Sequence, residues 1–428
     1  MKTKRNIFAH VDWLLLALYA TLVIFGRVNI YAVGYEPGHS LGLFDLSRSA
    51  GKQLLWITTT LSLFFVVFFL EARFYQSLAY VFYGFTILLL LGTFLWGVNV
   101  GGHRAWFSWG GQPSELVKLT CAMAVARYAD EAYAQLTRRK TQLTLLGLVL
   151  LPIVLILLQG DLGSSLVFVA FIIVFYREGL FTELFLVGVA MVVIFVLTLL
   201  VPHTYLIVGT LSLALIFIGL VRRTWQKIML VVLLTLGTLT LIEGANFLVE
   251  KVLKPHPQNR IKALVDPTID PLGLGWNVTQ SKIAIGSGGL WGKGFLQGSQ
   301  TKYGFVPEQS TDFIFCTIGE EHGWVGALLV IAIFLGLISR MLYIAEQQKV
   351  RFVRVYGYAV ASILFFHFMI NVGMTIGLMP VVGIPLPFIS YGGSSLWSFS
   401  LMLFLLLKLD AEKNGYHSWR RASSLDTL

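Results

Sequence analysis

The chain has 428 residues, a formal net charge of +10, 56% hydrophobic residues and only 13% charged residues, with a mean hydropathy of +0.76. A soluble globular protein of this length would carry roughly a quarter charged residues. The low charge, together with repeated apolar runs of about twenty residues, excludes a soluble globular fold and indicates a polytopic membrane protein. Cys121 and Cys316 lie in or beside apolar runs, so they provide neither a disulfide framework nor a zinc motif.

Twelve segments have the length and apolarity of membrane-spanning helices. They lie near residues 11–33, 52–70, 76–98, 114–129, 142–158, 161–176, 179–201, 203–221, 227–249, 322–344, 355–378 and 394–409. Tight junctions at 159–160 and 202–203 leave a count of about ten open, so we expect an all-α bundle of about 10–12 spans that forms one membrane domain over residues 1–428. The first run is too long for a secretory signal and lacks a cleavage site.

Basic residues cluster after every second span, which sets the orientation of the chain in the membrane. If the N-terminus is cytoplasmic, nearly every short inside segment is basic, as in RYADEAYAQLTRRK (127–140) and KVRFVR (349–354). This agrees with the positive-inside rule and favours twelve spans with both termini in the cytoplasm. The topology accounts for the net charge without a nucleic-acid partner.

One segment, residues 250–311, breaks the apolar pattern because it is polar and rich in glycine. By parity it is a long external loop, and residues 99–113 and 380–393 form shorter ones. A sixty-residue loop is far longer than an ordinary connector. Loops positioned by a rigid scaffold often carry function, so we expect the chemistry in this loop.

Several loop residues are suited to chemistry but also have structural interpretations. Asp266 and Asp270 each precede a proline, a pattern that is typical of turns. Five glycines in GSGGLWGKG (286–294), flanked by Lys282 and Lys293, would let the backbone approach a phosphate, but no Walker pattern is present. The two lysines would equally suit lipid head groups.

Ionisable residues within the membrane are costly, so they are usually functional or paired. Glu115 and Lys118 lie three apart on one helix face, where they can neutralise each other. Asp161 stands at the start of a span, where it can cap the helix. His367 and Asn371, spaced i and i+4, are expected to form a structural hydrogen-bonded pair.

Five ordered segments resemble the SEDS family (shape, elongation, division and sporulation), and within it the RodA branch more than the FtsW branch. They are GGHRAWFSWGGQPSELVKL (101–119), QGDLGSSL (159–166), DPTIDPLGLGWNVTQSKIAIGSGGLWGKG (266–294), FVPEQSTDFIFCTIGEEHGWVG (305–326) and NVGMTIGLMPVVGIPLPFISYGGSS (371–395). Gly160 departs from the family pattern QPDLG, which has proline at that position. The family typically has about ten spans, so residues 179–249 are expected to contain an extra helix pair.

The resemblance implies a peptidoglycan glycosyltransferase in the bacterial cytoplasmic membrane, with its active site facing the periplasm. Its substrate would be lipid II, and its partner a class B penicillin-binding protein. The resemblance makes Asp270 the catalytic carboxylate, with Asp266 as the alternative. It places Arg104, Trp106, Glu115 and Lys118 around the substrate cavity, with Asp161 retained in the family motif.

Lys118, Arg104 and Lys282 are the candidate contacts for the pyrophosphate leaving group. No cofactor is implied with certainty; a divalent cation is compatible with the acidic residues, although no metal-ligand spacing is diagnostic. Two other classes remain open: a flippase for the lipid-linked precursor, which would suit the intramembrane charges, and a non-enzymatic scaffold. A flippase would not require the long external loop.

Overall fold

The computed structural model describes residues 10–35, 45–100, 103–108, 110–132, 135–136, 138–180, 203–220, 224–247 and 274–413, with a few single residues between 188 and 201. Within these residues the chain is α-helical apart from one two-stranded hairpin. Contacts divide the chain into two units. Unit 1 comprises Met1–Leu180, Gln280–Ile376 and Val382–Leu428, and unit 2 comprises Phe181–Thr279 and Gly377–Val381.

Among the described residues, nine helices are long and apolar enough to cross a membrane. They are α1 (Trp13–Val33), α2 (Ser49–Phe69), α4 (Ala79–Trp96), α6 (Arg139–Leu158), α10 (His203–Leu220), α11 (Trp225–Phe247), α15 (Ile314–Glu346), α16 (Arg351–Thr375) and α17 (Gly393–Ala411). Each coincides with an expected span, and the fold class predicted from the sequence, a helical multi-pass membrane bundle, is confirmed.

Two further expected spans are helical but less apolar or less regular. One is α5 (Pro113–Glu131), which carries charged residues along its length. The other is divided into α7 (Leu162–Leu166), the 3-10 turn η3 (Val167–Ala170) and α8 (Phe171–Arg177). The twelfth expected span, 179–201, lies largely outside the described residues, as does the first part of the long loop. The short elements are α3 (Ala72–Ser77), β1 (Val98–Val100), β2 (His103–Trp106), α13 (Leu274–Ser287) and α14 (Ser299–Lys302).

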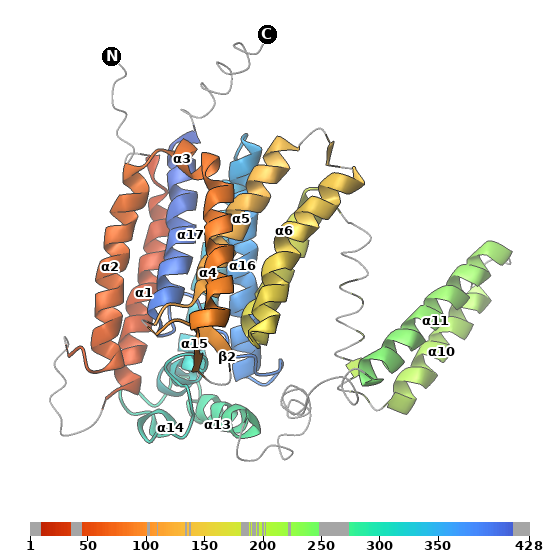
Figure 1. Ribbon diagram of the computed structural model, residues 1–428. Coiled ribbons are helices and arrows are strands. Elements are labelled where there is room, and N and C mark those ends of the chain that lie inside the picture. Colours follow the sequence, from red (N-terminus) through yellow and green to blue (C-terminus); the bar gives the residue numbers. More distant parts are fainter. Residues whose placement is uncertain are drawn as a thin grey trace, which may run out of the picture. The chain divides into compact units, whose positions relative to one another are not determined.

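In unit 1 the charged helix α5 lies in the interior of the bundle, in contact with α4, α6, α16 and α17 (Figure 1). Helices α16 and α17 have 78% and 83% of their apolar windows buried, compared with 28% to 39% for the outer helices of this unit. The outer helices instead expose apolar side chains, which lipid accommodates. Because α5 is enclosed by protein, its polar residues can be satisfied by neighbouring helices.

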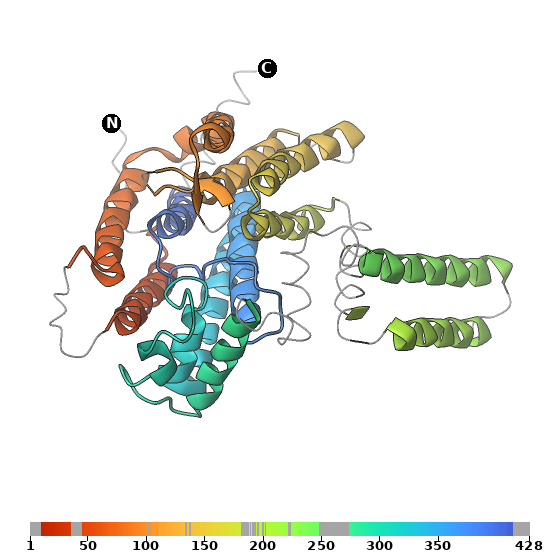
Figure 2. The same cartoon turned by 60° about the horizontal axis from the view of Figure 1, so that its bottom comes forward.

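Helix α14 and strand β2 lie at the end of unit 1 that is away from α3 (Figure 1). The same end comes forward in Figure 2. Helix α5 begins at this end, directly after the hairpin. The basic segments 127–140 and 349–354 lie at the opposite ends of their helices, so the positive-inside rule predicts that the end with α14 and β2 faces away from the cytoplasm.

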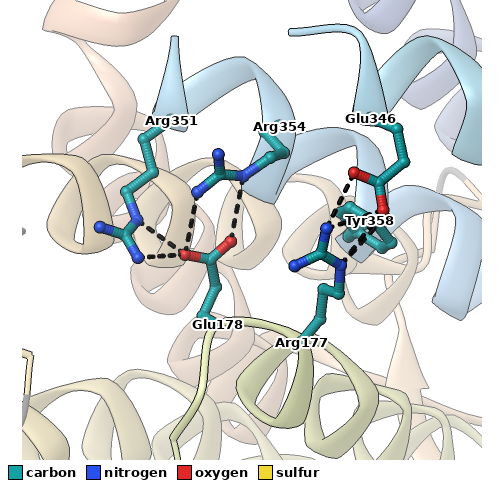
Figure 3. Close-up of polar contacts among 6 residues, drawn as sticks. All are labelled: Arg177, Glu178, Glu346, Arg351, Arg354 and Tyr358. Carbon is teal, nitrogen blue, oxygen red and sulfur yellow. Dashed lines mark hydrogen bonds and ion pairs between the residues drawn. The ribbon is translucent and has the colours of Figure 1, made fainter. Parts of the chain in front are cut away.

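The basic end of unit 1 is held by ion pairs between α8, α15 and α16 (Figure 3). The Glu178 carboxylate accepts bonds from Arg351 Nε at 2.7 Å and from Arg354 Nε at 3.3 Å. Arg177 Nη2 donates to both carboxylate oxygens of Glu346 at 2.7 and 2.8 Å. Because the Glu178 side chain is only 4% exposed, removal of its arginine partners would leave a buried carboxylate without a counter-charge, which costs more than the loss of a surface ion pair. These contacts fix the end of α8 against the α15–α16 turn.

In unit 2, helices α10 and α11 pack against each other. Both expose apolar side chains on several sides, among them Tyr205, Leu215, Leu220 and Leu233. These two helices occupy part of the 179–249 region, for which the sequence predicts an extra helix pair.

Candidate functional site

The β1–β2 hairpin and the starts of α5 and α7 are joined by hydrogen bonds. The Arg104 backbone N–H in β2 donates to the backbone oxygen of Gln159 at 3.3 Å. Gln112, the residue before α5, donates through Nε2 to Asp161 Oδ2 at 3.1 Å. The Arg104 side chain is exposed, and Trp106, which pairs with β1, is half-buried. The hairpin therefore presents one cation and one aromatic ring beside the first turn of α5.

Helix α6 ends in a left-handed closure that depends on glycine. Gly160 has φ +86°, and its N–H donates to the Leu157 oxygen at 3.0 Å. The Asp161 N–H donates to the Ile156 oxygen at 3.2 Å, which completes a Schellman motif. Proline has φ fixed near −65° and no N–H, so it cannot occupy this position. The glycine in QGDLG thus has a defined backbone role.

Asp161 caps the next helix, as predicted from its position. Its Oδ1 accepts the Ser164 N–H at 2.9 Å, and the side chain is 9% exposed. With Oδ2 bound to Gln112, both carboxylate oxygens have protein partners. Asp161 therefore orders the α6–α7 junction and connects it to α5.

A buried polar cluster lies one turn below the start of α5. Lys118 Nζ is 2.7 Å from Glu115 Oε1 and 3.0 Å from His367 Nε2 in α16. Glu115 is 2% exposed, and Lys118 and His367 are fully buried. The ammonium also lies 5.2 Å from the centre of the Phe399 ring in α17. The mutual neutralisation of Glu115 and Lys118 predicted from their spacing is confirmed, and His367 is a third partner.

The segment after Val382 covers this cluster and is held by side chains of α16. His367 Nδ1 is 3.3 Å from the backbone oxygen of Pro385. Asn371 Nδ2 donates at 2.8 Å to the backbone oxygens of Ile384 and Asp312. The predicted His367–Asn371 pair is therefore wrong, because each side chain bonds to a different partner. Together the two residues attach the external loop 382–390 to α16.

The glycine-rich segment packs against a kink in α15 at Gly323, where φ is +65° and ψ is −162°. A Cβ added at Gly288 would come within 2.0 Å of the Gly319 oxygen, and one at Gly292 within 2.1 Å of the Glu321 oxygen. These glycines allow close contact between two segments of the chain itself. The backbone approach predicted from glycine density is real, but here it is an approach to α15.

Glu320 of α15 forms hydrogen bonds to the glycine-rich segment and to α14. Its Oε1 lies 2.7 Å from Lys293 Nζ and accepts the Gln300 N–H at 2.9 Å. Its Oε2 accepts the N–H and the hydroxyl of Thr301 at 2.9 and 2.7 Å. The carboxylate is fully buried. Lys293 is therefore committed to Glu320, and the position of α14 is set by one glutamate.

The structure brings some of the predicted site residues together and leaves others apart. Glu115, Lys118 and Asp161 are connected through the first turn of α5, and Arg104 and Trp106 lie on the adjacent hairpin. Lys282 is exposed on α13 and is not bonded to this group among the described residues, whereas its neighbour Ser281 is buried and donates to the Thr375 oxygen at 2.8 Å. Asp266 and Asp270 lie outside the described residues.

Sequence reasoning missed His367 and Glu320 as members of these clusters. Their partners, Lys118 and Lys293, lie 249 and 27 residues away in the chain, so no local spacing connects them. The only sequence feature that indicated a role for His367 or Glu320 was an ionisable side chain within an apolar helix, because such a side chain requires a hydrogen-bond or charge partner. Among the described residues, no group of three His, Cys, Asp or Glu side chains could hold a metal ion.

The whole chain matches known proteins. A family model described as "Cell cycle protein" (FtsW, RodA and SpoVE) matches residues 12–211 and 191–415. The chain is 34% identical to a protein of Treponema pallidum named peptidoglycan glycosyltransferase RodA, covering 94% of this chain and 98% of that one. It is 32% identical to peptidoglycan glycosyltransferase MrdB of Escherichia coli, covering 90% of each.

Solved structures agree with this assignment. A chain from a study of polymerization and crosslinking by a peptidoglycan synthase complex is 27% identical, with a TM-score of 0.67 over 94% of this chain and 98% of that one. The rod shape determining protein RodA of Thermus thermophilus is 25% identical, with a TM-score of 0.61 over 94% of this chain and 97% of that one. The chain is thus a multi-pass membrane protein, and it belongs to the FtsW, RodA and SpoVE family of cell cycle proteins, the SEDS family that its motifs resemble.

Proposed function

We propose that this chain is a peptidoglycan glycosyltransferase that polymerises lipid II into glycan strands during cell elongation. The observation that carries the proposal is the similarity over at least 90% of the chain to two bacterial proteins named peptidoglycan glycosyltransferases. The enzyme resides in the bacterial cytoplasmic membrane, with its active site on the outside. The membrane location suits a substrate whose polyprenyl tail stays in lipid while its sugar head group lies at the external surface.

The proposed reaction is a single displacement. The 4-hydroxyl of an acceptor GlcNAc attacks C1 of a donor MurNAc, a new C–O bond forms, and the bond from C1 to the pyrophosphate oxygen breaks. The electron pair leaves with undecaprenyl pyrophosphate, and the hydroxyl proton passes to a carboxylate. Because an α-linked donor becomes a β-linked glycan, the configuration at C1 inverts. By analogy with inverting hydrolases, one carboxylate is proposed to activate the incoming oxygen.

Asp270 is the proposed base, and Asp266 is the alternative. Arg104, which is exposed on the hairpin, and Lys282, which is exposed on α13, are the proposed contacts for the pyrophosphate, whose developing charge needs cations. Trp106 is proposed to line the cavity. The long external loop over residues 250–311 would carry the catalytic motif.

Glu115, Lys118 and Asp161 have a different role in this proposal from the exposed cations. Their side chains are almost fully buried and bonded to protein partners. We therefore assign them to the floor of the substrate site, where they hold the first turn of α5 in place. Lys118 contributes its positive charge from below the surface rather than by direct contact.

The proposed partner is a class B penicillin-binding protein that crosslinks the new strands. One similar structure belongs to a complex whose description joins polymerization with crosslinking. The transpeptidation step requires a separate protein in this proposal, because the described residues form membrane helices and short connections. Membrane lipids surround the remaining faces.

A lipid-linked precursor flippase is the second candidate, and one observation favours it. The buried Glu115–Lys118–His367 cluster inside a helical bundle is typical of membrane transport proteins. A flippase would move lipid II between leaflets without needing a carboxylate in the external loop. Substitution of the loop aspartates separates the two functions.

The test compares purified Asp270→Asn and Asp266→Asn with wild type in polymerisation of labelled lipid II. Asp270→Asn should lower the rate at least about 100-fold, the scale of general-base catalysis, while Asp266→Asn keeps most of it. Both variants should remain monodisperse in detergent. A fully active Asp270→Asn enzyme would remove that residue from the mechanism.

A further inference from the structure

The buried cluster contains a histidine whose hydrogen-bonding state follows from its neighbours. A lysine ammonium can only donate hydrogen bonds. His367 Nε2, at 3.0 Å from Lys118 Nζ, must therefore accept, which leaves the ring proton on Nδ1. The carbonyl of Pro385, at 3.3 Å from Nδ1, can only accept, so the assignment agrees on both sides of the ring. His367 is thus an uncharged imidazole.

The ring is fixed in this position by packing as well as by hydrogen bonds. It meets the Phe399 ring edge to face, with centroids 4.8 Å apart and an angle of 80°. The same Phe399 ring lies 5.2 Å from the Lys118 ammonium. The His367 ring is therefore held by Phe399 of α17 as well as by its two hydrogen-bond partners.

The depth of the cluster suits a role beneath the reacting head group. Lys118 is five residues below Pro113, the first residue of α5. At 1.5 Å per residue, this places it about 8 Å below the external end of the helix. Because the ammonium is paired with Glu115, the field that it adds at a pyrophosphate above it depends on the exact position of the ammonium relative to that carboxylate. A small displacement of the ammonium would change that interaction.

We propose that His367 is a positioning residue, which as a neutral acceptor fixes the Lys118 ammonium and couples it to the external loop 382–390. The inference rests on the proposed polymerase function and extends it. His367 joins three parts of the molecule: α16, in which it lies, α5 through Lys118, and the loop through Pro385. Loss of the acceptor leaves the ammonium with Glu115 alone and releases one attachment of the loop.

The experiment compares His367→Phe, which keeps an aromatic ring but removes the acceptor, with His367→Gln, which keeps an acceptor. Initial rates over a range of lipid II concentrations give kcat and KM separately. His367→Phe should lower kcat about tenfold, the scale of one lost bond to a charged group, and change KM less than about twofold. His367→Gln should recover most of kcat. His322→Phe is the matched control, because His322 is a half-buried α15 histidine that contacts Phe25 instead, and it should behave as wild type.

A second measurement tests the acceptor role independently of turnover. His367→Phe should lower the melting temperature less in Lys118→Met than in wild type, because without the ammonium only the bond to Pro385 is lost. Equal melting losses in both backgrounds, unchanged kcat in His367→Phe, or no recovery by His367→Gln would each overturn the inference. Wild-type protein without polymerising activity would overturn the proposed function, and this inference with it.

Discussion

Glu320→Gln tests how the second half of the long loop, residues 293–301, is held against α15. The native carboxylate accepts Lys293 and the Gln300 N–H on one oxygen, and two donors of Thr301 on the other. An amide of the same shape has only one oxygen. Whichever way it is turned, its NH₂ group faces a buried backbone N–H, and the Lys293 ammonium loses its counter-charge.

The expected cost is about 3 kcal/mol of unfolding free energy, from one unsatisfied buried donor and one broken ion pair. Glu321→Gln is the matched control at the next position: Glu321 accepts backbone bonds from Leu296 and Gly298, but its Oε2 has no partner among the described residues, so an amide can keep the accepting oxygen and turn its NH₂ group to the side where no donor faces it. Thermal unfolding in detergent measures the difference, and limited proteolysis between residues 290 and 305 should be faster only in Glu320→Gln. Equal stability of the two variants would refute this account of the glycine-rich segment.

Two further pairs of variants test the α6 closure and the buried ion pair. Gly160→Pro should lower the free energy of unfolding by about 3 kcal/mol, because φ +86° and a donated N–H exclude proline. Gly160→Ala should lower it by only about 1 kcal/mol. Equal melting temperatures of the two variants would contradict the assigned backbone role. Lys118→Met alone should lower the free energy of unfolding by about 3–5 kcal/mol, because Glu115 is left charged and buried. The Glu115→Gln/Lys118→Met double variant should recover most of this loss. A double variant as unstable as the single one would show that the unpaired Glu115 charge is not the cause of the instability.

Much of the fold could be predicted because membrane spans are marked by length and apolarity. All nine long apolar helices among the described residues coincide with expected spans. Sequence alone does not show that α5 is interior, since its charges are satisfied by distant helices. Nor does it show the break in α15, where Gly323 adopts a left-handed φ only because the 288–292 segment packs against it.

The site was predictable where partners are close in sequence. The ion pair was predictable from the i, i+3 spacing of Glu115 and Lys118. The helix cap was predictable from the position of Asp161 directly before α7. His367 was predicted to bond Asn371 because only spacing within one helix could be read. Its actual partners, Lys118 and Pro385, come from another helix and a loop, and such contacts follow from the packing of the bundle.

Polymerisation of labelled lipid II by the purified wild-type protein tests the central claim most directly. The assay is run with and without a class B penicillin-binding protein, and the products are separated by size. The account predicts a ladder of glycan strands that disappears in the Asp270→Asn protein. An absence of strands from wild type under both conditions, together with movement of lipid II between leaflets in vesicles, would contradict it and favour transport.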